Sequence, residues 1–129
     1  MILDTDLLFS LLKGQKDAIK VLQSLEENNE NLSTIVITVY ELLKGAQISS
    51  KPEANTAQVQ NMLANLNIFD LTLQACNEGS ILYNDLKKAG CLTGEFDVLI
   101  AAIVKTSGET IMTRDKNFKL FKNIKVAEW

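Results

Sequence analysis

Short apolar runs alternate along this chain with stretches in which apolar residues recur at helical spacing. Runs of three to five apolar residues bounded by polar positions are typical of strands buried in a sheet. They predict strands at residues 1–3, 33–37, 67–71, 110–113 and 124–126. Because these runs are separated by helical patterns, the sequence predicts an α/β fold with a mainly parallel sheet.

Apolar residues three and four positions apart predict the helices between these strands. The periodic positions are Leu7, Leu8, Leu11 and Leu12, then Ala18, Leu22 and Leu25, Val39, Leu42, Leu43 and Ala46, Val59, Met62, Leu63 and Leu66, and finally Ala75, Gly79, Leu82, Tyr83 and Leu86. Residues 98–104 are apolar on every side, which indicates a buried helix, and residues 116–121 suggest a short helical turn. Capping boxes are expected at residues 38–41 and 50–53, and Thr72 is expected to cap the helix that follows it.

Bulk properties favour one compact domain over residues 1–129, because 47% of the residues are hydrophobic. No apolar run is long enough to span a bilayer, and the first residues place no basic segment ahead of an apolar one. We therefore expect no signal peptide, no membrane partner and a cytoplasmic protein. Cys76 and Cys91 fit no metal-binding spacing and are expected as two buried thiols.

Four acidic residues occupy related positions in this pattern. Asp4 ends the first strand, Glu41 lies in the first turn after the second, and Asp115 lies two residues past the fourth. Asp97 opens the buried helix that leads back to the fourth strand. In a parallel sheet, strand ends and the following helix starts share one edge, where open α/β folds place their sites. We expect the four carboxylates on one rim.

Each acid could cap a helix, but together they imply a cation. Carboxylates about 4 Å apart repel by roughly 4 kcal/mol at an effective dielectric near 20, so such a group must protonate or bind metal. Asp97 is the acid hardest to explain otherwise, because its helix has no polar face. The chain contains no histidine, which excludes histidine-based catalysis and histidine-ligated zinc and favours Mg²⁺ or Mn²⁺. A net charge of −3 disfavours binding of nucleic acid by charge alone.

The acids and their surroundings resemble the PIN-domain nucleases, in particular the VapC-type toxins. The similar stretches are residues 2–8 (ILDTDLL), 37–45 (ITVYELLKG), 94–102 (GEFDVLIAA), 113–118 (TRDKNF) and 126–129 (VAEW). This resemblance implies a metal-dependent endoribonuclease with a five-stranded, mainly parallel sheet between helical layers. It also implies RNA as the substrate, a cognate VapB-type antitoxin covering the site and a helical groove, and a homodimer.

Further side chains are candidates for secondary roles. Residues that either assist the site or only cap elements are Thr5, Asp6, Glu95 and Thr113. Cations near the acids in sequence, which would meet RNA phosphates, are Lys13, Lys44, Arg114, Lys116 and Lys119.

Two alternatives remain open from the sequence. In a receiver-type regulatory domain, Asp70 would be the phosphoacceptor and Lys125 the distal lysine, but that leaves Glu41 and Asp97 unexplained. A PIN-like module that binds without cutting is the second, although it has no reason to keep mutually repelling carboxylates.

Overall fold

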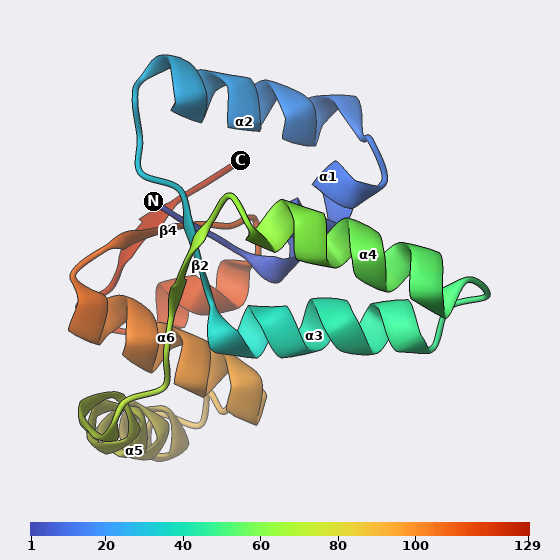
Figure 1. The fold of residues 1–129 in the computed structure, drawn as a ribbon. Coiled ribbons are helices and arrows are strands. Elements are labelled where there is room, and N and C mark those ends of the chain that lie inside the picture. The colour runs from blue at the N-terminus through green and yellow to red at the C-terminus, as the bar shows by residue number, and fades with distance from the viewer.

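A sheet of five parallel strands forms the centre of the protein, which is described over residues 1–129 by a computed structural model (Figure 1). The strands are β1 (Ile2–Leu3), β2 (Ser33–Ile35), β3 (Asn67–Phe69), β4 (Thr110–Met112) and β5 (Lys125–Ala127). Their order is β3-β2-β1-β4-β5, so the first strand of the chain is the central one. Because all pairings are parallel, every strand ends at the same edge of the sheet.

Six α-helices and one short 3₁₀ helix cover the two faces of this sheet. They are α1 (Thr5–Leu12), α2 (Lys16–Glu27), α3 (Val36–Gln47), α4 (Pro52–Leu63), α5 (Leu73–Lys88), α6 (Glu95–Ser107) and η1 (Lys116–Leu120). In Figure 1, α1, α2 and α4 lie toward one side of the strands, and α5 and α6 lie toward the other. The predicted arrangement of a parallel sheet between helical layers is confirmed.

Two separate apolar cores result from the alternation of side chains along each strand. Ile2 packs with α5, α6 and η1, whereas the next residue, Leu3, packs with α1, α2, α3 and α4. In α6 the residues from Ile100 to Val104 are all buried, as the unbroken apolar run predicts. The helix that carries Asp97 is therefore fixed along most of its length.

The second strand is shorter than the sequence predicts. It ends at Ile35, and α3 begins at Val36. Thr38 is consequently inside the first turn of α3, and the capping box expected at residues 38–41 is wrong because the N-cap residue is Ile35. The β-branched residues at positions 36 and 37 favoured a strand by local propensity, but tertiary packing overrides that preference.

The capping box expected at residues 50–53 is also wrong. Pro52 is the first residue of α4, but its N-cap is Lys51 and no side chain bonds there. Asn55 instead donates from Nδ2 to Ser49 Oγ at 2.8 Å. By contrast, the predicted cap at Thr72 is confirmed, because its hydroxyl accepts a hydrogen bond from the Ala75 backbone N–H at 3.1 Å.

The expectation of two buried thiols is wrong, since Cys76 and Cys91 are both exposed and free. Cys76 directly follows Ala75, which is fully buried in α5, so the next side chain on the helix points away from the core. Cys91 lies in the loop after α5. None of the helices has the length and apolar character needed to cross a membrane.

Candidate active site

Asp4 lies at the end of the central strand and forms the N-cap of α1. Its Oδ1 accepts a hydrogen bond from the Leu7 backbone N–H at 2.8 Å, and its own N–H donates to the Met112 carbonyl at 3.3 Å. The residue is only 8% exposed. Backbone hydrogen bonds on both sides therefore hold Asp4 in place at the end of the strand. Capping of α1 accounts for only one of the two oxygens of its carboxylate.

The three other acids reach the same place from different elements. Glu41 projects from α3, Asp97 from the first turn of α6, and Asp115 caps η1 by accepting from the Asn117 N–H at 2.9 Å. The four carboxylates line one cavity of about 160 Å³ at the carboxyl ends of the strands. Its other lining residues are Ile2, Thr5, Asp6, Ile35, Thr38, Ile100, Ile111 and Phe118. We call this cavity the acidic pocket.

Burial and mutual repulsion disfavour the charged forms of two of these acids. Desolvation by burial raises the pKa of Asp4 from 3.8 to about 6, although bonds from Thr113 and the Leu7 backbone partly oppose it. Desolvation also raises the pKa of Asp97, and the negative charges of Asp115 and Glu41 raise it further. The sequence singles out Asp97 as the acid most in need of a counter-charge. In the structure Asp4 is the more buried of the two, because the central strand is covered on both faces.

Hydroxyl groups orient the carboxylates within the pocket. Thr5 Oγ1 donates to Glu41 Oε1 at 3.1 Å and lies 3.0 Å from Thr38 Oγ1. Thr113 is buried, faces Asp4 and accepts from the Asp115 backbone N–H at 3.0 Å. The hydroxyls predicted to assist the site are therefore in contact with the acids. Thr38, which sequence analysis treated only as a helix start, lines the pocket and is hydrogen-bonded to Thr5.

Asp6 and Glu95 differ in their relation to the pocket. Asp6 lines it but is exposed and paired, because Arg114 Nε donates to its Oδ2 at 2.6 Å. Arg114 also reaches Asp17 at 3.5 Å, and its guanidinium lies 4.1 Å from the ring centre of Trp129. We call these four residues the arginine corner. Glu95 is exposed and does not line the acidic pocket.

None of the five predicted RNA-binding cations lines the acidic pocket. Arg114 belongs to the arginine corner, and Lys119 forms an ion pair with Glu128. Lys116 is exposed at the start of η1, two positions after Arg114. Lys44 lies over the ring of Tyr40, with Nζ 5.4 Å from the ring centre.

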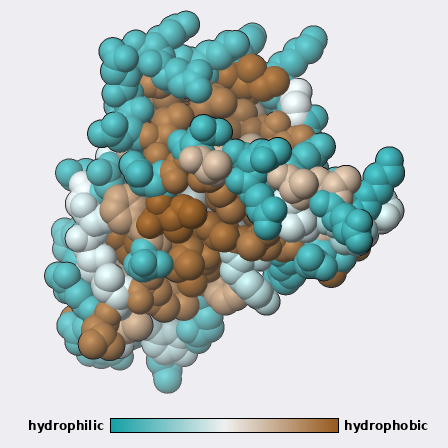
Figure 2. Space-filling model, viewed as in Figure 1, coloured by the Kyte–Doolittle hydropathy of each residue, from teal (hydrophilic) through white to brown (hydrophobic).

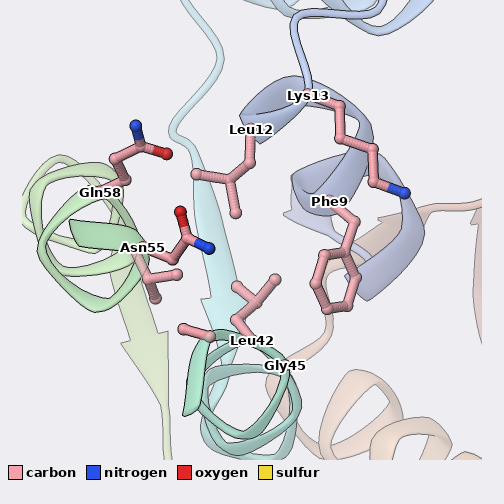
Figure 3. Close-up of a pocket in the computed structure, with 9 residues that line it drawn as sticks. Phe9, Leu12, Lys13, Leu42, Gly45, Asn55 and Gln58 are labelled. Atoms are coloured by element: carbon pink, nitrogen blue, oxygen red, sulfur yellow. The ribbon is translucent and has the colours of Figure 1, made fainter. Parts of the chain in front are cut away.

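Lys13 lies on a second cavity, of about 200 Å³, between α1, α3 and α4. Figure 3 shows it opposite Asn55 and Gln58, with Phe9, Leu12 and Leu42 between them. At its edge Gly45 leaves room for Phe9, whose ring would lie 3.0 Å from any Cβ added there. This cavity is separate from the acidic pocket, and the two share no lining residue.

Two aromatic residues beside the acids were not identified from the sequence. Tyr40 directly precedes Glu41, and Phe96 directly precedes Asp97. Their ring centres lie 5.8 Å apart in an edge-to-face arrangement. The available signal was that each aromatic residue adjoins a site acid in sequence, but only the packing of α3 beside α6 brings the two together.

The donor set of the acidic pocket is suited to a hard divalent cation. All the charged side chains that line the pocket are carboxylates, and the hydroxyls of Thr5 and Thr38 are the remaining polar side chains. No three acids lie close enough to hold one ion directly. Mg²⁺ keeps several waters and is usually bound through one or two carboxylates, so this wider spacing fits a partly hydrated ion.

The alternative phosphoacceptor, Asp70, does not belong to this site. It follows β3, which is an edge strand of the sheet, and it does not line the acidic pocket. Lys125 lies on the opposite edge strand, β5. The pair that a receiver-type domain requires is therefore split across the full width of the sheet.

Comparison with known proteins identifies the family to which this fold belongs. The tRNA(fMet)-specific endonuclease VapC of Salmonella typhimurium is 26% identical over 128 residues, covering 98% of this chain and 96% of that protein. Ribonuclease VapC2 of Haemophilus influenzae is 27% identical with the same coverage. The crystal structure of VapBC2 from Rickettsia felis, bound to a DNA fragment from its promoter, superposes with a TM-score of 0.90 at 25% identity, covering 99% of this chain and 97% of that one. The family model of the PIN domain matches residues 1–124, and the chain belongs to the PIN-domain family.

Proposed function

We propose that this protein is a metal-dependent endoribonuclease that acts as the toxin of a type II toxin–antitoxin pair. The observation that carries the proposal is the acidic pocket, in which four carboxylates from four separate segments surround one cavity. The relatives that match this chain in sequence along nearly their whole length are named ribonucleases or endonucleases. PIN-domain ribonucleases as a class depend on divalent metal ions.

We infer that Asp4, Glu41, Asp97 and Asp115 hold Mg²⁺ or Mn²⁺, in part through water. The raised pKa values of Asp4 and Asp97 support this inference, because burial disfavours the charged form of each carboxylate and a nearby positive charge would favour it. The only arginine of the chain is engaged at the arginine corner, so no side-chain cation fills the pocket. A divalent ion bound there would activate a water molecule for hydrolysis and offset negative charge on the phosphodiester.

The side chains of the pocket would each perform a definable task. Thr5 holds Glu41 in one orientation through the 3.1 Å hydrogen bond, which keeps its second oxygen free for a ligand. Asp4 is fixed by the Leu7 N–H, and burial raises its pKa to about 6 in the absence of metal, a penalty on the charged form that a bound divalent ion would relieve. The apolar floor of Ile2, Ile100 and Ile111 excludes water from below, which strengthens these electrostatic interactions.

An antitoxin of the VapB type is the partner we propose for this chain. The comparison structures from Rickettsia felis and Salmonella typhimurium are VapBC complexes bound to DNA. A third, apolar cleft of about 420 Å³ lies between α1, α2 and α4, and Leu11, Leu22 and Met62 are among its lining residues. Figure 2 shows the brown apolar surface between α2 at the top of the view and α4 below it. Such a cleft suits the apolar face of a partner helix.

We further propose a homodimer acting on RNA in the cytoplasm. The specificity for tRNA(fMet) is that of the Salmonella protein. Sequencing the 5′ ends of RNA fragments after a brief induction of this chain would identify the RNA that it cuts.

The proposal is tested by expressing the chain alone in bacteria and following growth. We expect arrest with the parent and normal growth with Asp4→Asn or Asp97→Asn. Asp70→Asn is the matched control, because Asp70 is an exposed acid that does not line the pocket. Arrest by Asp97→Asn as severe as that by the parent would refute the metal-nuclease mechanism.

A cleavage assay with purified protein separates the nuclease from a PIN-like module that only binds. We expect an RNA mixture to be cut in the presence of Mg²⁺ or Mn²⁺ and to stay intact when a chelator is added. Binding of RNA without any cleavage in either metal would favour the non-catalytic alternative.

A further inference from the structure

Tyr40 and Phe96 form an aromatic pair at the surface beside the acidic pocket. Their rings meet edge to face, at 5.8 Å between centres and 87° between planes. Tyr40 is 54% exposed and Phe96 39% exposed. Aromatic side chains normally bury most of their area, so two neighbouring rings left open to water indicate a surface that meets a ligand.

The backbone fixes this pair next to the reactive groups. Each ring is attached one residue before a pocket acid, Tyr40 before Glu41 on α3 and Phe96 before Asp97 on α6. The helix directs the two neighbours differently, so the acid points into the pocket while the ring lies outside it. A ligand that packs on the two rings therefore lies beside the carboxylates of the pocket.

Lys44 adds a positive charge at the same place. It lies one helical turn after Tyr40, and its Nζ is 5.4 Å from the centre of that ring. Lys44 is exposed and forms no ion pair with a carboxylate, in contrast to Arg114, Lys105 and Lys119. Its charge is thus available to an anionic ligand lying over the aromatic pair.

A substrate of the proposed nuclease needs such a surface. The chain has a net charge of −3 and its site is lined by carboxylates, so general attraction of phosphates contributes little to binding. Stacking of a base on an aromatic ring is independent of net charge, and every base has a face that can stack. Unpaired bases are the parts of an RNA that can reach such rings.

We propose that the aromatic pair is the stacking platform for an unpaired RNA base next to the scissile phosphodiester, with Lys44 contacting a neighbouring phosphate. The inference rests on the proposed ribonuclease function and names the side chains that would position its substrate. Tyr40 and Phe96 are binding residues in this scheme, and the chemistry stays with the acids.

Binding of a fluorescent oligonucleotide tests the platform without relying on cleavage. The probe is a single-stranded RNA of roughly ten nucleotides, within the usual site size of a single-strand binder, with 2-aminopurine placed at each position in turn. The protein carries Asp97→Asn so that the probe is not consumed. We expect quenching of 2-aminopurine at one position, and roughly tenfold weaker binding when Tyr40→Ala and Phe96→Ala are combined, equivalent to about 1.4 kcal/mol.

Two controls isolate the rings from other effects. Tyr40→Phe with Phe96→Tyr keeps both rings and should retain both binding and quenching. Leu73→Ala removes a 90% exposed apolar side chain that does not line the pocket, and it should leave binding unchanged. If the double alanine variant bound the probe as tightly as its parent, the platform would be refuted. A change in the molar mass of the variant in light scattering would also refute it, and would assign the rings to an interface between copies of the chain.

Kinetics on the metal-loaded protein keep this inference separable from the proposed function. With the acids intact, the double alanine variant should raise KM about tenfold and change kcat much less, because stacking contributes to binding rather than to bond cleavage. Cleavage that is lost only through kcat would contradict the platform while leaving the nuclease in place. Quenching without any cleavage by the parent would contradict the nuclease while leaving the platform in place.

Discussion

The acidic pocket and the arginine corner are neighbouring clusters of carboxylates that differ in their counter-charge. The carboxylates of the corner are paired with an arginine, whereas the four acids of the proposed metal site have no side-chain cation in contact. Asp4 of the pocket and Asp6 of the corner are only two residues apart. Asp6 is exposed and bonded at 2.6 Å to Arg114, which also reaches Asp17 and Trp129. Asp4 is buried and has no cation in contact, so burial raises its pKa to about 6.

This difference separates structural acids from functional ones. A carboxylate paired with arginine is satisfied by the protein itself and tolerates water, whereas the pocket acids destabilise one another and the fold. Perturbed pKa values of this kind gather at functional sites. We infer that the pocket carboxylates remain without a side-chain counter-charge because they bind a metal ion. The ion pairs of the arginine corner instead hold Arg114 against Trp129.

The largest contrast is expected in catalysis. Asp97→Asn should lower kcat/KM by on the order of a thousandfold, at the upper end of what loss of one electrostatic stabiliser costs. Asp6→Asn should lower it far less, because Asp6 is already neutralised by Arg114. Cleavage of a labelled RNA in Mn²⁺ gives both values, and equal losses would remove the distinction between the two clusters.

Stability should change in the opposite direction to activity. The folded pKa of Asp4 is about 6 against 3.8 when exposed, so the folded protein binds more protons between these values and loses stability as pH rises through them. Asp4→Asn removes this penalty and should stabilise the metal-free chain by about 3 kcal/mol above pH 6. The gain should vanish below about pH 4. Urea unfolding at several pH values in chelator measures it, and a pH-independent gain would contradict the assignment.

Metal addition should distinguish the clusters by a smaller amount. An ion bound only to the folded state at a hundred times its dissociation constant stabilises by about 2.7 kcal/mol. Thermal unfolding of the parent and of Asp6→Asn should therefore shift upward with Mg²⁺ or Mn²⁺. Asp4→Asn should shift less, and an undiminished shift in that variant would place the ion outside the pocket.

The smallest effect is expected at the arginine corner. Arg114→Gln removes an exposed ion pair and a stacking contact on Trp129, so the melting temperature should fall by no more than a few degrees. High salt should reduce the difference from the parent, since exposed pairs are screened. A large fall in melting temperature that salt does not reduce would contradict the description of the arginine corner as an exposed, screened ion pair.

Sequence reasoning succeeded where local pattern and sheet topology agree. The positions of Asp4, Glu41 and Asp115 relative to their strands were enough to predict a common rim, because parallel strands must end on the same side. It failed at Thr38 and Cys76, where a helix started earlier or a side chain turned outward. Both depend on how elements pack, which no local propensity records.

What the sequence determined alone is the chemistry available to this protein. The absence of histidine, the positions of the four acids along the chain and the alternating apolar pattern restrict the site to oxygen ligands on a parallel sheet. Only the tertiary structure decided which acid is buried, how Thr5 orients Glu41, and that Tyr40 meets Phe96. Residue types and order are local properties of the chain, whereas desolvation and contact arise only when distant segments pack together.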